Sequence, residues 1–169
     1  MSANYYQLVK PTGDDEEIFR KTSERELYPT RFNTTIRGNF FALKISPSKL
    51  NIFDASVKDL KMNYLLFANI DFENLIKSAK QLEINIREIR TIATEEDLQE
   101  ELEKYLLKKD YEALLKFIDE NSITIKELEF SYDNAIIRVY DSGIIWSDSD
   151  LSKTTKLTHL IESILELVE

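Results

Sequence analysis

The last third of the chain has the most regular spacing of apolar and polar residues. Segments 123–130, 136–140 and 144–147 are short apolar runs with the length and composition of strands. Asp133-Asn134 separates the first two runs, and Asp141-Ser142-Gly143 separates the second from the third. Both separators are typical of tight turns. This pattern predicts an antiparallel meander of three strands.

The spacing then becomes that of a helix. Ser149 or Asp150 is expected to cap it, and apolar residues at intervals of three and four predict a face that covers one side of the sheet. His159, the single histidine, falls on the opposite face and is expected to point to solvent, which disfavours a catalytic role. The apolar face consists of Leu157, Leu160, Ile161, Ile164, Leu165 and Val168.

The middle of the chain predicts a strand, a helix and a second strand. The run 62–70 has the length of a strand buried on both faces, and Asp71 is placed to cap a helix through about Gln81. The next strand opens at Ile84, and its alternation slips near Ile89, which indicates a bulge or an end. Joined by a right-handed crossover, the two strands of segment 62–93 would add a parallel pair. The expected buried helix residues are Phe72, Leu75, Ile76 and Ala79.

Two helices with a very short joint are predicted next. The run Thr94-Glu95-Glu96-Asp97 has a capping residue followed by acids, which is typical of a helix start, and Asp110 is placed to cap the second helix. The pair is expected to form a helical hairpin. Its buried residues are expected to be Leu98, Leu102, Tyr105, Leu106, Tyr111, Leu114, Leu115 and Ile118.

Residues 1–50 form the least regular part of the chain and contain all three prolines. Segment 5–9 predicts a short strand, and segment 18–28 predicts a short helix. Segment 34–45 is rich in Thr, Ile and Phe and predicts a longer strand, with a bulge or close backbone approach at Gly38.

Together these elements predict an α+β fold. The 169 residues fit one domain, 1–169, with 43% hydrophobic residues available for a core. We expect an antiparallel or mixed sheet of about five to seven strands with helices mainly on one face. A three-stranded C-terminal meander followed by a helix completes the expected architecture.

Charge divides the chain into two unlike parts. Residues 18–49 hold 7 basic and 2 acidic residues, whereas residues 95–169 hold 8 basic and 19 acidic residues, out of a net charge of −9. Such asymmetry bears on partners and association rather than on fold. Opposite charges on one chain also invite contacts between copies, so a homodimer is one expected assembly.

Several function classes lack the residues that they need. Without cysteine there is no thiolate nucleophile and no Cys-based metal site. Three widely spaced glycines exclude phosphate-cradling loops and the dinucleotide fingerprint, and we expect no cofactor. No apolar run approaches the ~20 residues that span a bilayer. The amino-terminal segment has no leader-like pattern, so a cytoplasmic location without membrane contact is expected.

One dense carboxylate cluster suggests an enzyme as the alternative. Asp141, Asp148 and Asp150 lie in a predicted turn region, and hard cations bind several oxygen ligands from short loops. The spacing does not match a calcium loop, and turn and cap roles explain these acids as well. A small metal-dependent phosphodiesterase or nuclease is therefore a secondary hypothesis, and we assign no catalytic residue or metal ligand.

The basic stretch suggests a second alternative. Its basic residues are interleaved with aromatic ones, a composition that suits single-stranded nucleic acid. The overall negative charge disfavours this, since such binding depends largely on cations. Pairing with the acidic half of the chain, or of a second copy, is the preferred interpretation. The residues concerned are Arg20, Lys21, Arg25, Arg31 and Arg37.

The acidic half gives the leading hypothesis. Six acids between Glu95 and Glu103 exceed what helix capping requires. Trp146 stands beside acids and has the character of an interface anchor, unless it fills the core. We expect a non-enzymatic interaction module that binds a basic protein, in the manner of inhibitor, immunity or anti-defence proteins. The expected partner-binding residues are Glu95, Glu96, Glu100, Glu101, Glu103, Trp146, Asp148 and Asp150.

Overall fold

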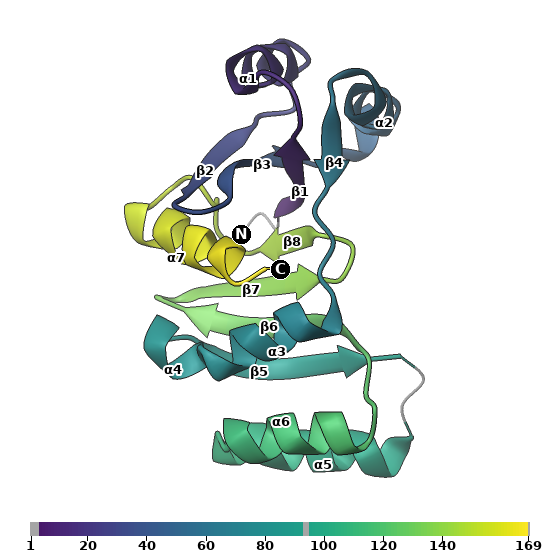
Figure 1. Cartoon of the computed structure of the whole chain (residues 1–169), viewed down its shortest axis with the longest axis vertical. Helices are drawn as coiled ribbons and strands as arrows, with labels where there is room; N and C mark the ends of the chain where they lie inside the picture. The colour runs from purple at the N-terminus through teal and green to yellow at the C-terminus, as the bar shows by residue number, and fades with distance from the viewer. Residues whose placement is uncertain (1–3, 93–94, 169) are drawn as a thin grey trace.

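The fold is α+β, with one antiparallel sheet and helices on both of its faces (Figure 1). The computed structural model describes residues 4–92 and 95–168. In chain order the elements in these ranges are β1 (Asn4–Pro11), α1 (Asp15–Glu24), β2 (Thr30–Thr34), β3 (Gly38–Lys44), the 3-10 helix η1 (Pro47–Lys49), α2 (Leu50–Asp59), β4 (Met62–Tyr64), α3 (Asn69–Lys77), α4 (Ala79–Leu82), β5 (Asn85–Thr91), α5 (Glu96–Lys108), α6 (Tyr111–Glu120), β6 (Ile125–Tyr132), β7 (Ala135–Tyr140), β8 (Ile144–Ser147) and α7 (Thr155–Glu166).

The strand order is β2-β3-β1-β8-β7-β6-β5, with β4 paired to β1 outside this path. Strand β1 pairs with β8 along residues 4–7 and with β4 along residues 9–11. At the change of partner, Leu8 donates its N–H to the Gly143 carbonyl at 2.9 Å and accepts from Leu65 N–H at 3.1 Å. The β7–β8 turn and the segment after β4 therefore meet at this point of β1.

The core forms two clusters of apolar residues in the described chain, one on each face of the sheet. The larger cluster joins inward residues of the strands to α3, α4, α5, α6 and α7. The smaller one joins Val9, Phe41 and Leu43 of the sheet to Ile18 of α1 and to residues of α2. Burying both faces of β1 and β3 requires apolar residues at consecutive positions, and residues 40–43 supply them.

The predicted C-terminal region is confirmed. Strands β6, β7 and β8 form the meander, and the apolar face of α7 is buried in the larger cluster. The cap, however, is Thr154, whose hydroxyl accepts from Leu157 N–H at 3.2 Å, rather than Ser149 or Asp150. Residues 150–153 first form a turn closed from Lys153 N–H to the Asp150 carbonyl, so the helix starts later than predicted.

The strand predicted over residues 34–45 is confirmed only for 38–44, because residue 34 ends β2 and residues 35–37 form the turn of a β2–β3 hairpin. Thr34 closes the turn, since its hydroxyl accepts from Arg37 N–H at 3.0 Å and donates to the Gly38 carbonyl at 2.9 Å. Gly38 has φ +78° and begins β3, so its positive φ serves a turn and not a bulge. The first helix starts and ends earlier than the predicted 18–28. Asp14 caps its start, where the Asp14 carboxylate accepts a hydrogen bond from Glu17 N–H at 3.0 Å.

The apolar run 62–70 is likewise not one strand. Strand β4 ends at Tyr64, and α3 begins at Asn69, whose side chain bonds the backbone of Ile123 and Ile125. Asp71 lies within the helix, where its carboxylate accepts from Ala68 N–H at 2.7 Å. The expected buried residues of this helix are confirmed, although the helix is interrupted at Ser78.

No parallel pair exists within the described segments, which contradicts the crossover considered for 62–93. Strand β4 pairs with β1 and β5 pairs with β6, both antiparallel. The irregularity expected near Ile89 is confirmed by register shifts at 86/88 and 90/91 of β5. Ala93 and Thr94 lie outside the described residues.

Strand β2 forms one edge of the sheet, and α7 lies beside it (Figure 1). Glu162 accepts a hydrogen bond from Asn33 N–H, and Glu166 accepts one from Thr35 N–H, both at 2.5 Å. Carboxylates from a helix thus occupy edge donors that would otherwise pair with another strand.

Candidate functional site

Helices α5 and α6, here called the acidic hairpin, lie at one end of the molecule beyond edge strand β5 (Figure 1). Lys109 joins them in a left-handed conformation, and Asp110 caps α6 by accepting from Ala113 N–H at 3.2 Å, as predicted. Leu102 and Leu106 of α5 are buried, and the rings of Tyr105 and Phe117 pack at 5.5 Å between centroids. The hairpin is therefore fixed to the core and presents a defined outer face.

An acidic stripe, defined as Glu96, Glu100, Glu103 and Leu107, runs along this outer face. The spacings of four, three and four residues place the members on one side of the helix. Within the described residues, none of its three acids has an ion-pair partner within 4.0 Å. Leu107 is 84% exposed. Glu100 does act through space on Lys104, whose pKa it helps to raise. The stripe thus combines acids that have no close ion pair with an exposed apolar side chain.

Two predicted site residues of α5 differ from the stripe. Glu95 is the residue before the helix, and its side chain makes no capping hydrogen bond. Glu101 is partly buried and pairs with Lys104, Oε1 to Nζ at 3.0 Å, which raises the pKa of Lys104. The charge of Glu101 is therefore partly neutralised within the helix.

A groove of about 490 Å³ separates α5 from β5 next to the stripe. Glu103, Leu106 and Leu107 line it from the helix, and residues 85–89 line it from the strand. Gln99 donates to the Ile89 carbonyl at 3.3 Å, and the Tyr111 hydroxyl accepts from Ile86 N–H at 3.3 Å. These side chains occupy part of the free edge of β5.

Trp146 lies on the sheet face opposite the larger cluster, so it does not fill the sheet–helix core. The Arg138 guanidinium stacks on its ring at 4.4 Å, and Arg138 also bonds Glu129 at 2.7 Å. The hydrogen bond that Arg138 donates to the Glu129 carboxylate raises the pKa of Arg138. Strands β7, β6 and β5 lie between Trp146 and α5. The predicted partner-binding residues therefore fall on separate surfaces.

The clustered aspartates are divided among separate structural tasks. Asp141 pairs with Lys126 at 3.4 Å, Asp148 accepts from Ile136 N–H at 2.9 Å, and Asp150 accepts from Ser152. Within the part of the chain that the structure describes, no three His, Cys, Asp or Glu residues gather as metal ligands. The geometry consequently gives no support to the metal-dependent alternative.

Four basic residues of the first half pair with acids that lie within residues 16–59, and none of these acids belongs to the acidic half. Arg20 pairs with Glu24 at 2.8 Å and Lys21 with Glu17 at 2.9 Å. Arg31 pairs with Glu16 at 3.1 Å and stacks on the Phe19 ring at 4.6 Å. The remaining pair, Arg25–Asp59, spans 3.9 Å. Pairing with the acidic half of the same chain is therefore wrong for these four residues, whereas pairing with a second copy stays a prediction. Among the described residues Arg37 has no ion pair within 4.0 Å.

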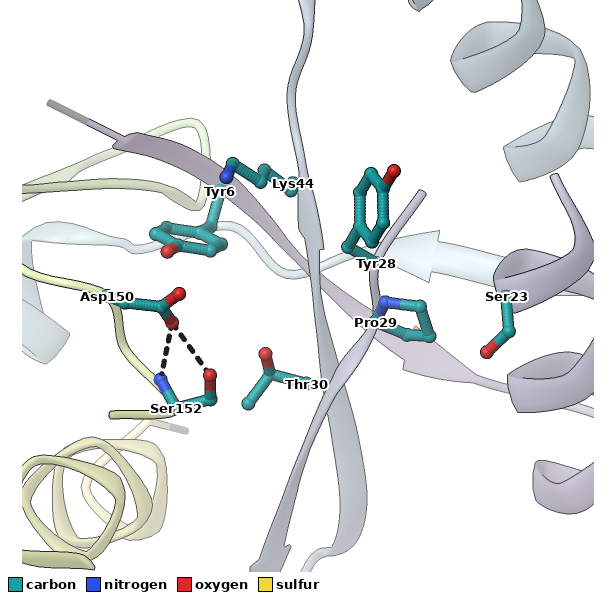
Figure 2. A pocket seen from close by; sticks show the side chains of 8 residues that line it. All are labelled: Tyr6, Ser23, Tyr28, Pro29, Thr30, Lys44, Asp150 and Ser152. Carbon is teal, nitrogen blue, oxygen red and sulfur yellow. Dashed lines mark hydrogen bonds between the residues drawn. The ribbon is translucent and has the colours of Figure 1, made fainter. Parts of the chain in front are cut away.

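A second concavity was not found from the sequence. Figure 2 shows Tyr6 and Lys44 of β1 and β3, Tyr28 and Pro29 of the segment before β2, and Asp150 from the segment before α7 around a pocket of about 480 Å³. Ser23, Thr30 and Ser152 complete the lining. These residues meet through sheet pairing across most of the chain, and no local motif signals such a meeting.

His159 is confirmed as solvent-facing, with 70% of its side chain exposed and Nδ1 at 3.1 Å from Glu162. No helix in the described ranges is long and apolar enough to cross a membrane. Models of protein families, curated proteins and solved structures were all compared with the chain, and none matches it.

Proposed function

We propose that this chain is a non-enzymatic interaction module that docks on a basic protein surface, as an inhibitor, immunity or anti-defence protein would. The observation that carries the proposal is the acidic stripe, in which three acids without an ion pair within 4.0 Å precede an exposed leucine at the protruding end of the molecule. Opposed charges speed encounter and select the partner, while a desolvated apolar contact slows dissociation.

The contrast with the opposite end of the molecule supports this assignment. There, Glu16, Glu17, Glu24 and Glu26 each pair with a basic residue. Surplus charge of one sign costs stability through self-repulsion, and it is concentrated where the fold does not use it. The groove beside Leu107 adds a concave surface for an apolar partner side chain.

The experiment has two stages. Partners are first captured from a source lysate at low and high salt, and the purified partner is then used in stopped-flow association. Glu96→Gln, Glu100→Gln and Glu103→Gln together should slow association about tenfold and flatten its salt dependence, with little change in dissociation.

The matched control removes three exposed charges from the other end, as Glu16→Gln, Glu24→Gln and Asp54→Asn. It changes the net charge by the same amount and should leave association within about twofold of the parent, because screening confines the effect to nearby charges. Equal association rates for the two triple variants would show that the stripe is ordinary solvated surface.

A further inference from the structure

The pocket of Figure 2 has the size and the polar construction of a small-ligand site. Its volume of about 480 Å³ falls in the range of small-molecule pockets. Three parts of the chain that are distant in sequence form it: strands β1 and β3, the end of α1 with the start of β2, and the segment before α7. Paired strands form one wall, and on the opposite segment hydrogen bonds from Ser152 position Asp150 before any ligand arrives.

One side of the pocket is a fixed anion. Asp150 Oδ1 accepts from Ser152 N–H at 2.9 Å and from Ser152 Oγ–H at 2.7 Å. Hydrogen bonding from the Ser152 hydroxyl, with smaller effects from Lys44 and Tyr6, lowers the pKa of Asp150. Tyr6 is 2% exposed, and burial raises its pKa, so its hydroxyl stays protonated. The carboxylate is therefore ionised and held in place.

The pocket also holds a cation, Lys44, whose ammonium lies beside the Tyr6 ring and makes no ion pair with this anion (Figure 2). Lys44 on β3 acts on the pKa of Asp150 through space, yet no ion pair within 4.0 Å joins them. In the described part of the chain, Lys44 makes no ion pair with any other acid within that distance. Two opposite charges thus line one pocket without pairing with each other.

Tyr28 supplies an aromatic wall at a conformational cost. Its φ is +45°, an uncommon value for a bulky residue, and Pro29 follows it. Backbone hydrogen bonds of the adjacent Leu27, to Thr22 and Lys44, hold the segment in this shape. The ring is 62% exposed and stands across the pocket from Asp150 (Figure 2). Strain of this kind is retained where the surroundings fix it, often at binding sites.

We propose that this pocket binds a small zwitterion of the α-amino acid class, with its ammonium group on Asp150, its carboxylate on Lys44 and its side chain against Tyr28. A ligand with one charge would satisfy one wall and meet a like charge on the other. A zwitterion satisfies both, and an aromatic or other flat side chain also gains contact with the Tyr28 ring.

The test is titration of the isotope-labelled full chain with pools of the standard free amino acids, followed by amide shifts in NMR. The best binder is then compared with its carboxamide, which keeps the ammonium, and its N-acetyl form, which keeps the carboxylate. We expect shifts around residues 28–30, 44 and 150–152, and about tenfold weaker binding of each blocked form. No shifts in this region up to about 10 mM, or equal binding of all three forms, would overturn the proposal.

Three variants assign the contacts. In Lys44→Met, the free amino acid should no longer bind more tightly than its carboxamide. In Asp150→Asn, it should no longer bind more tightly than its N-acetyl form, while the Asn side chain still provides an acceptor for Ser152. Asn tolerates the left-handed backbone at position 28, so Tyr28→Asn should keep the fold. It should weaken the binding of free aromatic amino acids more than the binding of free alanine. The stripe variant, with Glu96, Glu100 and Glu103 changed to Gln, should bind amino acids like the parent chain. This pocket and the proposed partner docking can therefore fail independently.

Discussion

Gly143→Ala should be among the most destabilising small substitutions in this chain. Gly143 has φ +83°, and a Cβ there would lie 1.8 Å from the Leu65 carbonyl oxygen. The left-handed conformation costs an alanine about 1–2 kcal/mol. The clash must also move backbone, which puts at risk the hydrogen bonds Leu65 N–H to Leu8, Phe67 N–H to Asp141 and Leu8 N–H to Gly143. At about 1 kcal/mol each, losing two or three brings the total to about 3–5 kcal/mol.

Gly38→Ala is the matched control, because Gly38 has φ +78° and its added Cβ would meet the flexible Lys10 ammonium at 3.4 Å. It should cost about 1–2 kcal/mol, the conformational part alone. Urea unfolding followed by Trp146 fluorescence and by circular dichroism gives both free energies. Equal losses in the two variants would refute the reasoning, since the difference between them is assigned wholly to the Leu65 contact.

Two further predictions concern the segment before α7. Thr154→Ala should lower the free energy of unfolding by about 1 kcal/mol, because it removes the helix cap. Ser149→Ala should change that free energy by less than about 0.5 kcal/mol. Urea midpoints that rank the two variants the other way would contradict the assigned cap. Because the folded-state pKa of Asp150 is lowered, its stabilising contribution is present above the unfolded pKa of about 3.9 and is lost as pH falls through the folded value. Asp150→Asn should therefore reduce the difference between urea midpoints at neutral and acid pH, and an unchanged difference would speak against this linkage.

The sequence predicted the elements whose periodicity is set by one buried face. The meander β6–β8, the face of α7 and the acidic hairpin all have that character, so polar and apolar residues alternate with the period of the element. Residues 40–43 and 62–68 lack it: the first group is buried on both faces, and the second passes from strand through loop to helix. Composition alone does not distinguish these cases.

The candidate surfaces were predictable to unequal degrees. The charged residues of α5 are local in sequence and lie on a helix whose buried side was also predictable, so their exposure followed. The pocket around Tyr6, Lys44 and Asp150 depends on β1 pairing with β3 and on the chain returning to it after β8. Pairing between strands so far apart in sequence is not contained in local periodicity, which is why the pocket was missed.

Side chains cover backbone groups at the β2 and β5 edges of the sheet, and this affects how copies of the protein can associate. Joining a second chain strand to strand at β2 would first require Glu162 and Glu166 to release the backbone of Asn33 and Thr35. That release would cost two charge-assisted hydrogen bonds, and at β5 the side chains of Gln99 and Tyr111 already bond part of the edge. Main-chain pairing of copies at β2, and over part of β5, thus competes with hydrogen bonds already made in the native state, which lowers the tendency of a protein with an exposed leucine and a strongly charged end to form fibres.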